Sequence, residues 1–220
     1  MTGGASANAG ASELVWYVSY GSNLNRARFI TYIEGGRIPG NNVVHEGCTD
    51  PTPPIDDVSL ELPQSLYFAG WSRAWGGTAA GFITLDAQKA PALARAYLIT
   101  PRQLQEVVRQ ENGNVVRVDD VHLDIDGARK HGHVRMLPQG YYSELVYCGR
   151  RDGYAMLSFT ASENRTDFRP PSPPYLRMIH RGLQESHGLN TDDAVEYLKD
   201  RPGVAGHWTV SQLVEMLRNS

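Results

Sequence analysis

One carboxylate in this sequence occupies a position where an apolar residue is expected. The sequence predicts a helix that begins at Pro101, with an apolar stripe of Leu104, Val107 and Val108. Glu111 continues that stripe, so we expect its side chain to point inward. Burial raises the pKa of a carboxyl group, and the negative end of the helix dipole raises it further. Glu111 is therefore a candidate general acid or base.

Glu111 also has a structural interpretation. An ion pair with an arginine such as Arg73 or Arg117 would explain an inward carboxylate without any catalysis. The last turn of a helix is, in addition, often solvated. The residues alone leave both interpretations open.

The second candidate feature is the glycine turn YGSNL at residues 20–24. Residues 14–20 alternate large side chains, which predicts a strand buried on both sides, and a helix is expected after the turn. Free backbone N–H groups at such a helix start favour a carboxylate or a developing oxyanion, and Gly21 lets a ligand approach closely. The alternative is that Ser22 or Asn23 merely caps the helix.

Other candidates for chemistry are weaker. Trp71 and Trp75 flank Arg73 and could line a pocket, although aromatic residues on a strand more often belong to a core. His131 and His133 could be two metal ligands, but a third ligand is not nearby and a solvated turn is favoured. Nothing resembles a G-x-S-x-G nucleophile turn or a phosphate-binding loop.

The remaining pattern predicts a single domain over 13–220 that mixes strands and helices, after a disordered tail at 1–12. The many Pro and Gly residues of 37–64 predict a long loop insertion. Strands are expected in a hairpin at 65–86 and at 94–99, 115–125, 133–137, 145–148 and 154–160. Further helices are expected from Pro173 to Gly188 and, as C-terminal helices within 190–220, at 192–199 and 210–217.

Composition excludes several classes of protein. The 220 residues contain 21 Lys and Arg against 24 Asp and Glu, and no basic run would follow a phosphate backbone, so nucleic acid is not expected as a partner. Cys48 and Cys148 lie far apart, which is typical of a reducing, cytoplasmic protein. No apolar stretch approaches the roughly 20 residues that cross a bilayer, so no membrane partner is expected. Whether the chain forms a homodimer is left open.

Four motifs together resemble one family. The segments are VSYGSNL at 18–24, FAGWSRAWGG at 68–77, QENG at 110–113 and PPSPPY at 170–175. Their sequences, their order and their placement relative to the helices are similar to those of the γ-glutamylcyclotransferases. One such motif is moderately specific, and four in order make chance resemblance improbable.

The resemblance implies an α+β fold, a small mixed β-barrel flanked by helices, and an enzyme that needs no metal or other cofactor. The implied reaction is attack of the α-amine of a small-molecule γ-glutamyl substrate on its own γ-carbonyl, which releases 5-oxoproline and an amine. The implied roles are Glu111 as general acid and base and, as substrate-binding residues, Tyr20, Gly21, Ser22, Asn23, Leu24 and Tyr175.

The sequence departs from the family pattern in ways that concern the substrate. The regions 36–64 and 113–154 are longer than expected, and Val118 stands near the place of a family tyrosine. Tyr141 or Tyr142 could replace that tyrosine only if the fold brings them round. The accepted amine is therefore open, and so are two rival functions, a non-catalytic binding or sensor module of the same fold and a γ-glutamyl amide hydrolase.

Overall fold

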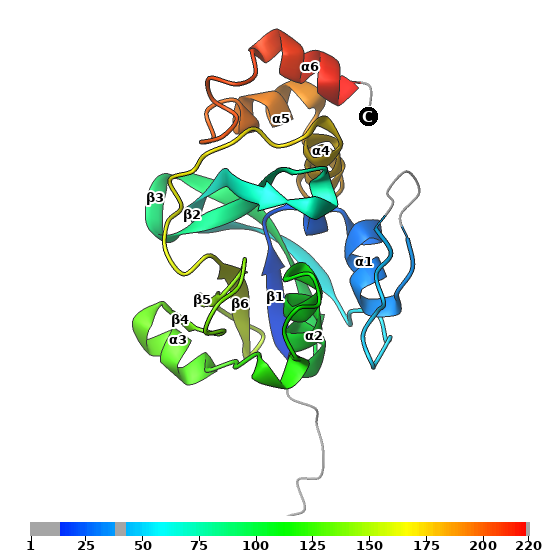
Figure 1. Ribbon diagram of the computed structural model, residues 1–220, viewed down its shortest axis with the longest axis vertical. Helices are drawn as coiled ribbons and strands as arrows, with labels where there is room; N and C mark the ends of the chain where they lie inside the picture. Colours follow the sequence, from blue (N-terminus) through cyan, green and yellow to red (C-terminus); the bar gives the residue numbers. More distant parts are fainter. Residues whose placement is uncertain (1–13, 38–42, 219–220) are drawn as a thin grey trace, which may run out of the picture.

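A mixed six-stranded sheet organises the chain. The computed structural model describes residues 14–37 and 43–218 (Figure 1). The strand order is β2-β3-β1-β6-β5-β4. The strands are β1 (Val15–Ser19), β2 (Asp57–Ser72), β3 (Thr78–Ile99), β4 (His133–Arg135), β5 (Glu144–Arg151) and β6 (Tyr154–Thr160). The α-helices are α1 (Arg26–Glu34), α2 (Pro101–Glu111), α3 (Ile125–His131), α4 (Pro173–His187), α5 (Thr191–Leu198) and α6 (Val210–Arg218).

The central strand β1 is buried on both faces, as its sequence predicts. It pairs antiparallel with β3 and parallel with β6. Trp16 and Val18 pack into a core with residues of α4, α5 and α6, whereas Val15 and Tyr17 pack into a second core with residues of α1, α2 and α3. The helices therefore form two groups, one on each face of the sheet (Figure 1).

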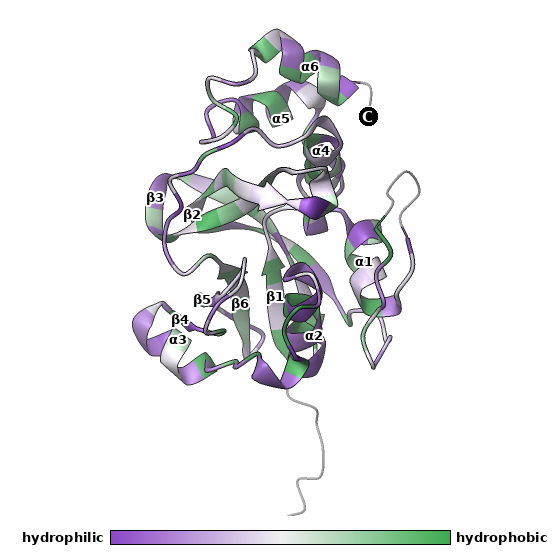
Figure 2. Ribbon diagram, in the orientation of Figure 1, coloured by the Kyte–Doolittle hydropathy of each residue, from purple (hydrophilic) through white to green (hydrophobic). Residues whose placement is uncertain are grey.

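The α+β class expected from the resemblance is confirmed, and the sheet is open. Within the described residues β2 and β4 are the two ends of the strand order, so "barrel" describes the curl of the sheet only loosely. In Figure 2 the turns of α5 and α6 carry both apolar and polar residues, as expected for helices that bury one side. Of the helices in the described part of the chain, none is long and apolar enough to cross a membrane.

The segment expected as a loop over 37–64 is partly a strand. Residues 43–56 are largely irregular, but β2 begins at Asp57 and pairs with β3 from there. Pro63 lies at a register shift between Leu62 and Gln64. Because β2 is an edge strand, the missing N–H group of Pro63 breaks no ladder to a further strand. The expected tail over 1–12 and residues 38–42 lie outside the described residues.

No strand forms over 115–125, where the sequence pattern predicts one. This region contains a short 3-10 helix, Val118–Asp120, an irregular stretch over 121–124 and then the start of α3 at Ile125. Asp124 caps α3, since its side chain accepts a hydrogen bond from Gly127 N. Asp119 and Asp120 are exposed, so the charged residues here serve a helix start and a surface turn instead of a ladder.

Helix ends were predicted better than strands. The capping box of α2 joins Thr100 and Gln103, and Thr209 and Gln212 exchange equivalent hydrogen bonds at the start of α6. Ser172 is the N-cap of α4, with Pro173 in the first turn, although its side chain makes no capping hydrogen bond. These signals are local, so tertiary contacts do not change them.

Candidate active site

The glycine turn after β1 presents free backbone donors. Residues Ser22–Leu24 form one turn of 3-10 helix, and α1 follows after Asn25. The N–H groups of Ser22 and Asn23 have no acceptor among the described residues, whereas Leu24 N donates to Gly21 O. The expected cap is displaced, because Asn25 caps α1 by accepting from Arg28 N at 3.0 Å. Ser22 and Asn23 are therefore not used as caps.

The turn is held in place by close packing against α4. A Cβ atom on Gly182 would come 2.4 Å from Leu24 Cβ, so only glycine allows this approach. Leu24 is fully buried in the core beside α4 and does not line the pocket. Leu24 therefore packs in the core and fixes the turn, and its substrate contact stays a prediction. Tyr97 adds a polar restraint, because its hydroxyl donates to Asn23 O at 2.8 Å.

Glu111 points inward toward that turn. Asn23 Nδ2 donates to Glu111 Oε1 at 2.8 Å and to the hydroxyl oxygen of Tyr17 at 3.3 Å. The Tyr32 hydroxyl also acts on Glu111 and lowers the pKa of its carboxyl group. The inward orientation expected from the helix pattern is confirmed, and the carboxylate lies in the same pocket as Gly21.

The two neighbours of Glu111 fix the end of α2. Gln110 Nε2 donates to Tyr32 O at 2.9 Å, which ties the helix to α1. On the other side, Asn112 Nδ2 donates to Tyr142 O and Asn112 Oδ1 accepts from Tyr142 N, both at 3.0 Å. The carboxylate is therefore positioned by rigid contacts in both directions, which is what a catalytic group requires.

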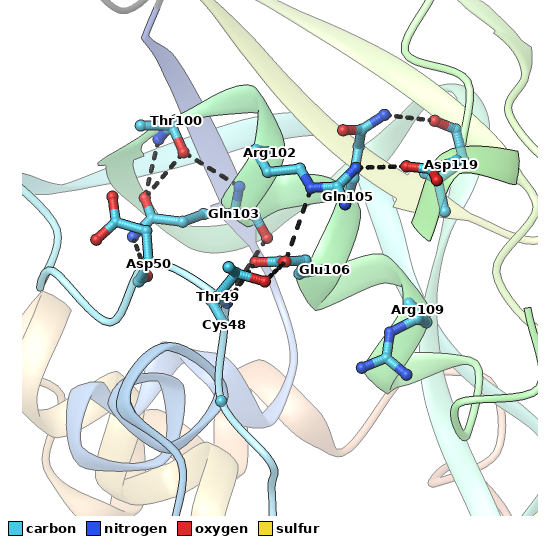
Figure 3. Close-up of polar contacts among 12 residues, drawn as sticks. Cys48, Thr49, Asp50, Thr100, Arg102, Gln103, Gln105, Glu106, Arg109 and Asp119 are labelled. Carbon is cyan, nitrogen blue, oxygen red and sulfur yellow. Dashed lines mark hydrogen bonds and ion pairs between the residues drawn. The ribbon is translucent and has the colours of Figure 1, made fainter. Parts of the chain in front are cut away.

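Segment 48–52 is fastened to the outer side of α2, as Figure 3 shows. The buried Glu106 carboxylate accepts from Thr49 N at 3.0 Å and from Thr49 Oγ1 at 2.6 Å. Gln103 Nε2 donates to Asp50 O and Thr52 O. Arg109 and Glu46 form a further ion pair. These contacts hold the chain that precedes β2 beside the pocket.

Burial raises the pKa of the Glu111 carboxyl above its ordinary value of 4.5. The positive charge of Arg28 and the hydrogen bonds from Tyr32 and Asn23 oppose this shift and limit it. Within the described residues, neither Arg73 nor Arg117 forms an ion pair with Glu111. A carboxyl with a raised pKa is a better base than a surface Glu and can also return the proton.

Arg28 is the site residue that the sequence interpretation missed. It is buried, and Arg28 Nε donates to Ser22 Oγ at 2.8 Å while its Nη2 donates to the Tyr32 hydroxyl at 2.9 Å. Its guanidinium also lies 4.8 Å from the ring centre of Trp75. The available signal was that Arg28 lies four residues before Tyr32, which places both side chains on the same side of the predicted helix.

A cavity of about 730 Å³ joins these groups. It is lined by the aromatic residues Tyr20, Tyr141, Tyr142, Tyr175 and others. Tyr175 accepts from Gly81 N at 2.9 Å, and Tyr142 donates to Gly81 O at 3.1 Å. The Tyr20 hydroxyl donates to Phe159 O, so the hydroxyl has its hydrogen-bond partner and the ring forms part of the cavity wall. The fold therefore does bring Tyr141 and Tyr142 round to the pocket.

His45 forms another part of the wall. Its ring lies 4.0 Å from that of Tyr32, and burial together with the charge of Arg28 lowers its pKa to about 4. The imidazole is therefore neutral near pH 7. No group of three or more His, Cys, Asp or Glu side chains that could hold a metal ion occurs within residues 14–37 and 43–218.

The arrangement can perform proton transfer at an acyl centre. A carboxylate of raised pKa faces a turn with two free N–H donors, in a cavity large enough for a small molecule. The donors can bind a carboxylate or oxyanion, and Glu111 can take a proton from a nearby nucleophile.

A solved structure with a known title shares this fold. No protein-family profile matches the sequence. A structure titled γ-glutamyl cyclotransferase matches with a TM-score of 0.52 at 15% sequence identity, over 94% of this chain and 100% of its own. An uncharacterized protein from Homo sapiens matches with a TM-score of 0.49 at 16% identity, over 94% of this chain and 99% of its own. At these identities the first likeness shows the fold alone.

A curated relative gives a different kind of match. The protein named histone deacetylase 5 of Arabidopsis thaliana is 29% identical over 198 residues, which is 84% of this chain and 30% of the relative. The chain thus spans less than a third of the length of that relative. The printed name belongs to the whole, longer protein.

Proposed function

We propose that this protein is a γ-glutamylcyclotransferase-like enzyme that converts a γ-glutamyl amide into 5-oxoproline and a free amine. The observation that carries the proposal is the 2.8 Å hydrogen bond from Asn23 Nδ2 to Glu111 Oε1. It joins the glycine turn to a carboxyl group of raised pKa inside one cavity. The fold shared with a structure of that title supports the same reaction.

The reaction needs one group that first accepts and then donates a proton. The neutral α-amine attacks the γ-carbonyl carbon, and a new C–N bond closes the five-membered ring. Glu111 takes the proton that this nitrogen loses and gives it to the departing amide nitrogen as the old C–N bond breaks. No water is consumed, so the products are 5-oxoproline and the free amine.

The turn supplies the binding half of the site in this proposal. The free N–H groups of Ser22 and Asn23 receive the glutamyl end of the substrate, and Gly21 keeps that approach open. Tyr20 and Tyr175 form the walls beside it. Glu111 and these backbone donors suffice for the steps above, so we propose a reaction that is independent of metal ions.

The setting of the enzyme is part of the proposal. We propose a cytoplasmic protein whose partner is a small-molecule γ-glutamyl compound, with neither nucleic acid nor membrane as a ligand. The near balance of 21 basic and 24 acidic residues supports this choice. A homodimer is compatible with the same site.

The test is an assay for 5-oxoproline with γ-glutamyl amino acids, γ-glutamyl amines and glutathione. Wild type is expected to form 5-oxoproline, and Glu111→Gln to lower kcat by about a hundredfold or more. Glu215→Gln, on the exposed side of α6, is the matched control and should keep the wild-type rate.

Each other outcome names a rival. Wild-type kcat in Glu111→Gln would remove Glu111 from the mechanism. Glutamate in place of 5-oxoproline would identify an amide hydrolase, in which water attacks. Tight binding of γ-glutamyl compounds without any turnover would identify a binding or sensor module.

A further inference from the structure

Exposed apolar side chains gather at the mouth of the active-site cavity. Among the described residues, six large hydrophobic side chains are strongly exposed, and three of them line this cavity. These three are Val44, Trp71 and Val115, with exposed fractions of 61%, 55% and 81%. They come from three separate segments of the chain. Single exposed apolar residues are ordinary, but a cluster at one cavity marks a binding surface.

The indole of Trp71 is held in position by the fold. A Cβ atom on Gly77 would lie 2.9 Å from Trp71 Nε1, so the ring packs directly over a glycine across the β2–β3 turn. Gly77 has a φ of +80°, which also favours glycine there. Deeper in the same loop, Trp75 stacks on Tyr175 at 4.5 Å. The connection from β2 to β3 thus offers two aromatic side chains to the cavity, a stacked Trp75 and an exposed Trp71.

The charges of the cavity exclude a cationic ligand group at its mouth. Glu111 is the sole carboxylate among the described lining residues, whereas Arg28 and Arg73 are both cationic. Glu111 already accepts a hydrogen bond from Asn23. An ammonium group bound at the mouth would lose water and find no counter-charge there.

The mouth is also where the departing amine must lie. In the proposed function the glutamyl end occupies the turn at residues 21–23, and Glu111 reaches the departing nitrogen. The rest of the amine must then extend outward past Glu111. Val115 follows Glu111 closely in the chain and lines the same cavity.

We infer that the site selects γ-glutamyl amides whose amine portion is apolar and carries no positive charge, and that Val44, Trp71 and Val115 form the subsite for it. This inference rests on the proposed function. It assigns to Trp71 a specificity role that the sequence pattern left undecided between pocket and core.

A matched pair of substrates tests the inference. γ-Glutamyl pentylamide and γ-glutamyl putrescine have tails of equal length, which end in a methyl and an ammonium group. We expect kcat/KM for the pentylamide to exceed that for the putrescine amide at least tenfold. Burial of one methylene favours binding about fourfold, and an unpaired charge opposes it further.

Three variants localise the effect. Val115→Glu adds a carboxylate at the mouth and should shift the ratio of the two kcat/KM values toward the cationic amide by about tenfold. Trp71→Ala should lower kcat/KM for γ-glutamyl pentylamide more than kcat/KM for γ-glutamyl methylamide, whose tail is too short to reach the mouth. Val210→Glu, at an exposed position on α6 outside the cavity, is the matched control and should leave the ratio unchanged.

The failure of the inference can be separated from failure of the proposed function. Both amides are also titrated by calorimetry into Glu111→Gln, which measures binding without turnover. If no amide yields 5-oxoproline, the proposed function is contradicted. The ratio of the two Kd values still tests whether the mouth of the cavity prefers an apolar tail. Equal kcat/KM and Kd values for the two amides, or a ratio unmoved by Val115→Glu, would overturn the inference.

Discussion

Asn23 and Glu111 are separated by 88 residues in the sequence, and their side chains meet at 2.8 Å. Asn23 donates to Glu111 through Nδ2, while its Oδ1 is buried without a hydrogen-bond partner among the described residues. Its backbone oxygen is held by Tyr97. One residue of the glycine turn is therefore a rigid donor to the carboxylate and also keeps an unused acceptor beside it. In native proteins an unpaired buried acceptor is uncommon and asks for a functional explanation.

Removing the Asn23 amide should weaken catalysis without unfolding the protein. Asn23→Ala deletes the donor to Glu111, and a hydrogen bond to a charged group contributes about 1.5–3 kcal/mol. We therefore expect kcat/KM for 5-oxoproline formation to fall by about 10- to 100-fold. Asn23→Asp places a second carboxylate beside Glu111, and repulsion between the two charges raises the pKa of Glu111. Below pH 7 we therefore expect a lower kcat/KM for Asn23→Asp than for Asn23→Ala. Wild-type kinetics in Asn23→Ala would show that this contact is dispensable.

The sequence was sufficient for the parts of the site that depend on local patterns. Glu111 could be predicted to face inward because helical spacing places it on the stripe of Leu104 and Val108, both fully buried. The capping box at Thr100 fixed where that helix begins. These inferences need no knowledge of the tertiary structure.

Asn112 and Tyr142 were beyond local reasoning. Each acts through partners distant in the chain, such as the exchange of hydrogen bonds between Asn112 and Tyr142. The close packing of Leu24 against Gly182 likewise joins residues that are far apart in the chain, so local patterns could not predict it. The prediction of a loop over all of 37–64 was wrong for a related reason. Pro63 argued against a strand, but an edge strand such as β2 tolerates a proline.

The charge of Arg28 should control the acidic limb of the pH profile. Its attraction lowers the pKa of Glu111 against the larger effect of burial. Arg28→Gln removes that attraction, so the pH at which kcat/KM falls to half should move upward. Arg28→Lys keeps the charge and should leave the limb nearer to its wild-type position. The measurement is 5-oxoproline formation from pH 4 to pH 9, with circular dichroism to confirm folding. If kcat/KM fell to half at the same acidic pH in both variants, Arg28 would have no electrostatic role.

Glu111→Gln should gain stability relative to wild type as the pH rises. The folded-state pKa of Glu111 is raised above 4.5, so the folded chain binds this proton more tightly than the unfolded chain. The stabilisation is complete below pH 4.5 and is lost as the pH rises through the folded pKa. Glutamine lacks this loss and still offers Oε1 to Asn23. Thermal unfolding of both proteins between pH 4 and pH 8 should therefore show a Tm difference that grows in favour of Glu111→Gln, whereas a constant difference would contradict the raised pKa.

Gly21 and Tyr175 should be energetically coupled. Gly21 has a φ of −114°, which any residue can adopt, but a Cβ atom there would lie 3.1 Å from the Tyr175 hydroxyl oxygen. Gly21→Ala should therefore lower kcat/KM about tenfold or more through this contact. Tyr175→Phe removes the hydroxyl and leaves Gly81 N without its acceptor, which costs about 1–3 kcal/mol of stability.

The double variant separates these effects. If the contact is responsible, Gly21→Ala should reduce kcat/KM less in the Tyr175→Phe background than in wild type, because the clashing atom is gone. The four proteins form a double-mutant cycle, and the coupling is read from their kcat/KM values at one pH. Additive losses would instead mean that the alanine methyl group obstructs the substrate itself at the turn, and that Tyr175 shapes the wall without limiting the approach to Gly21.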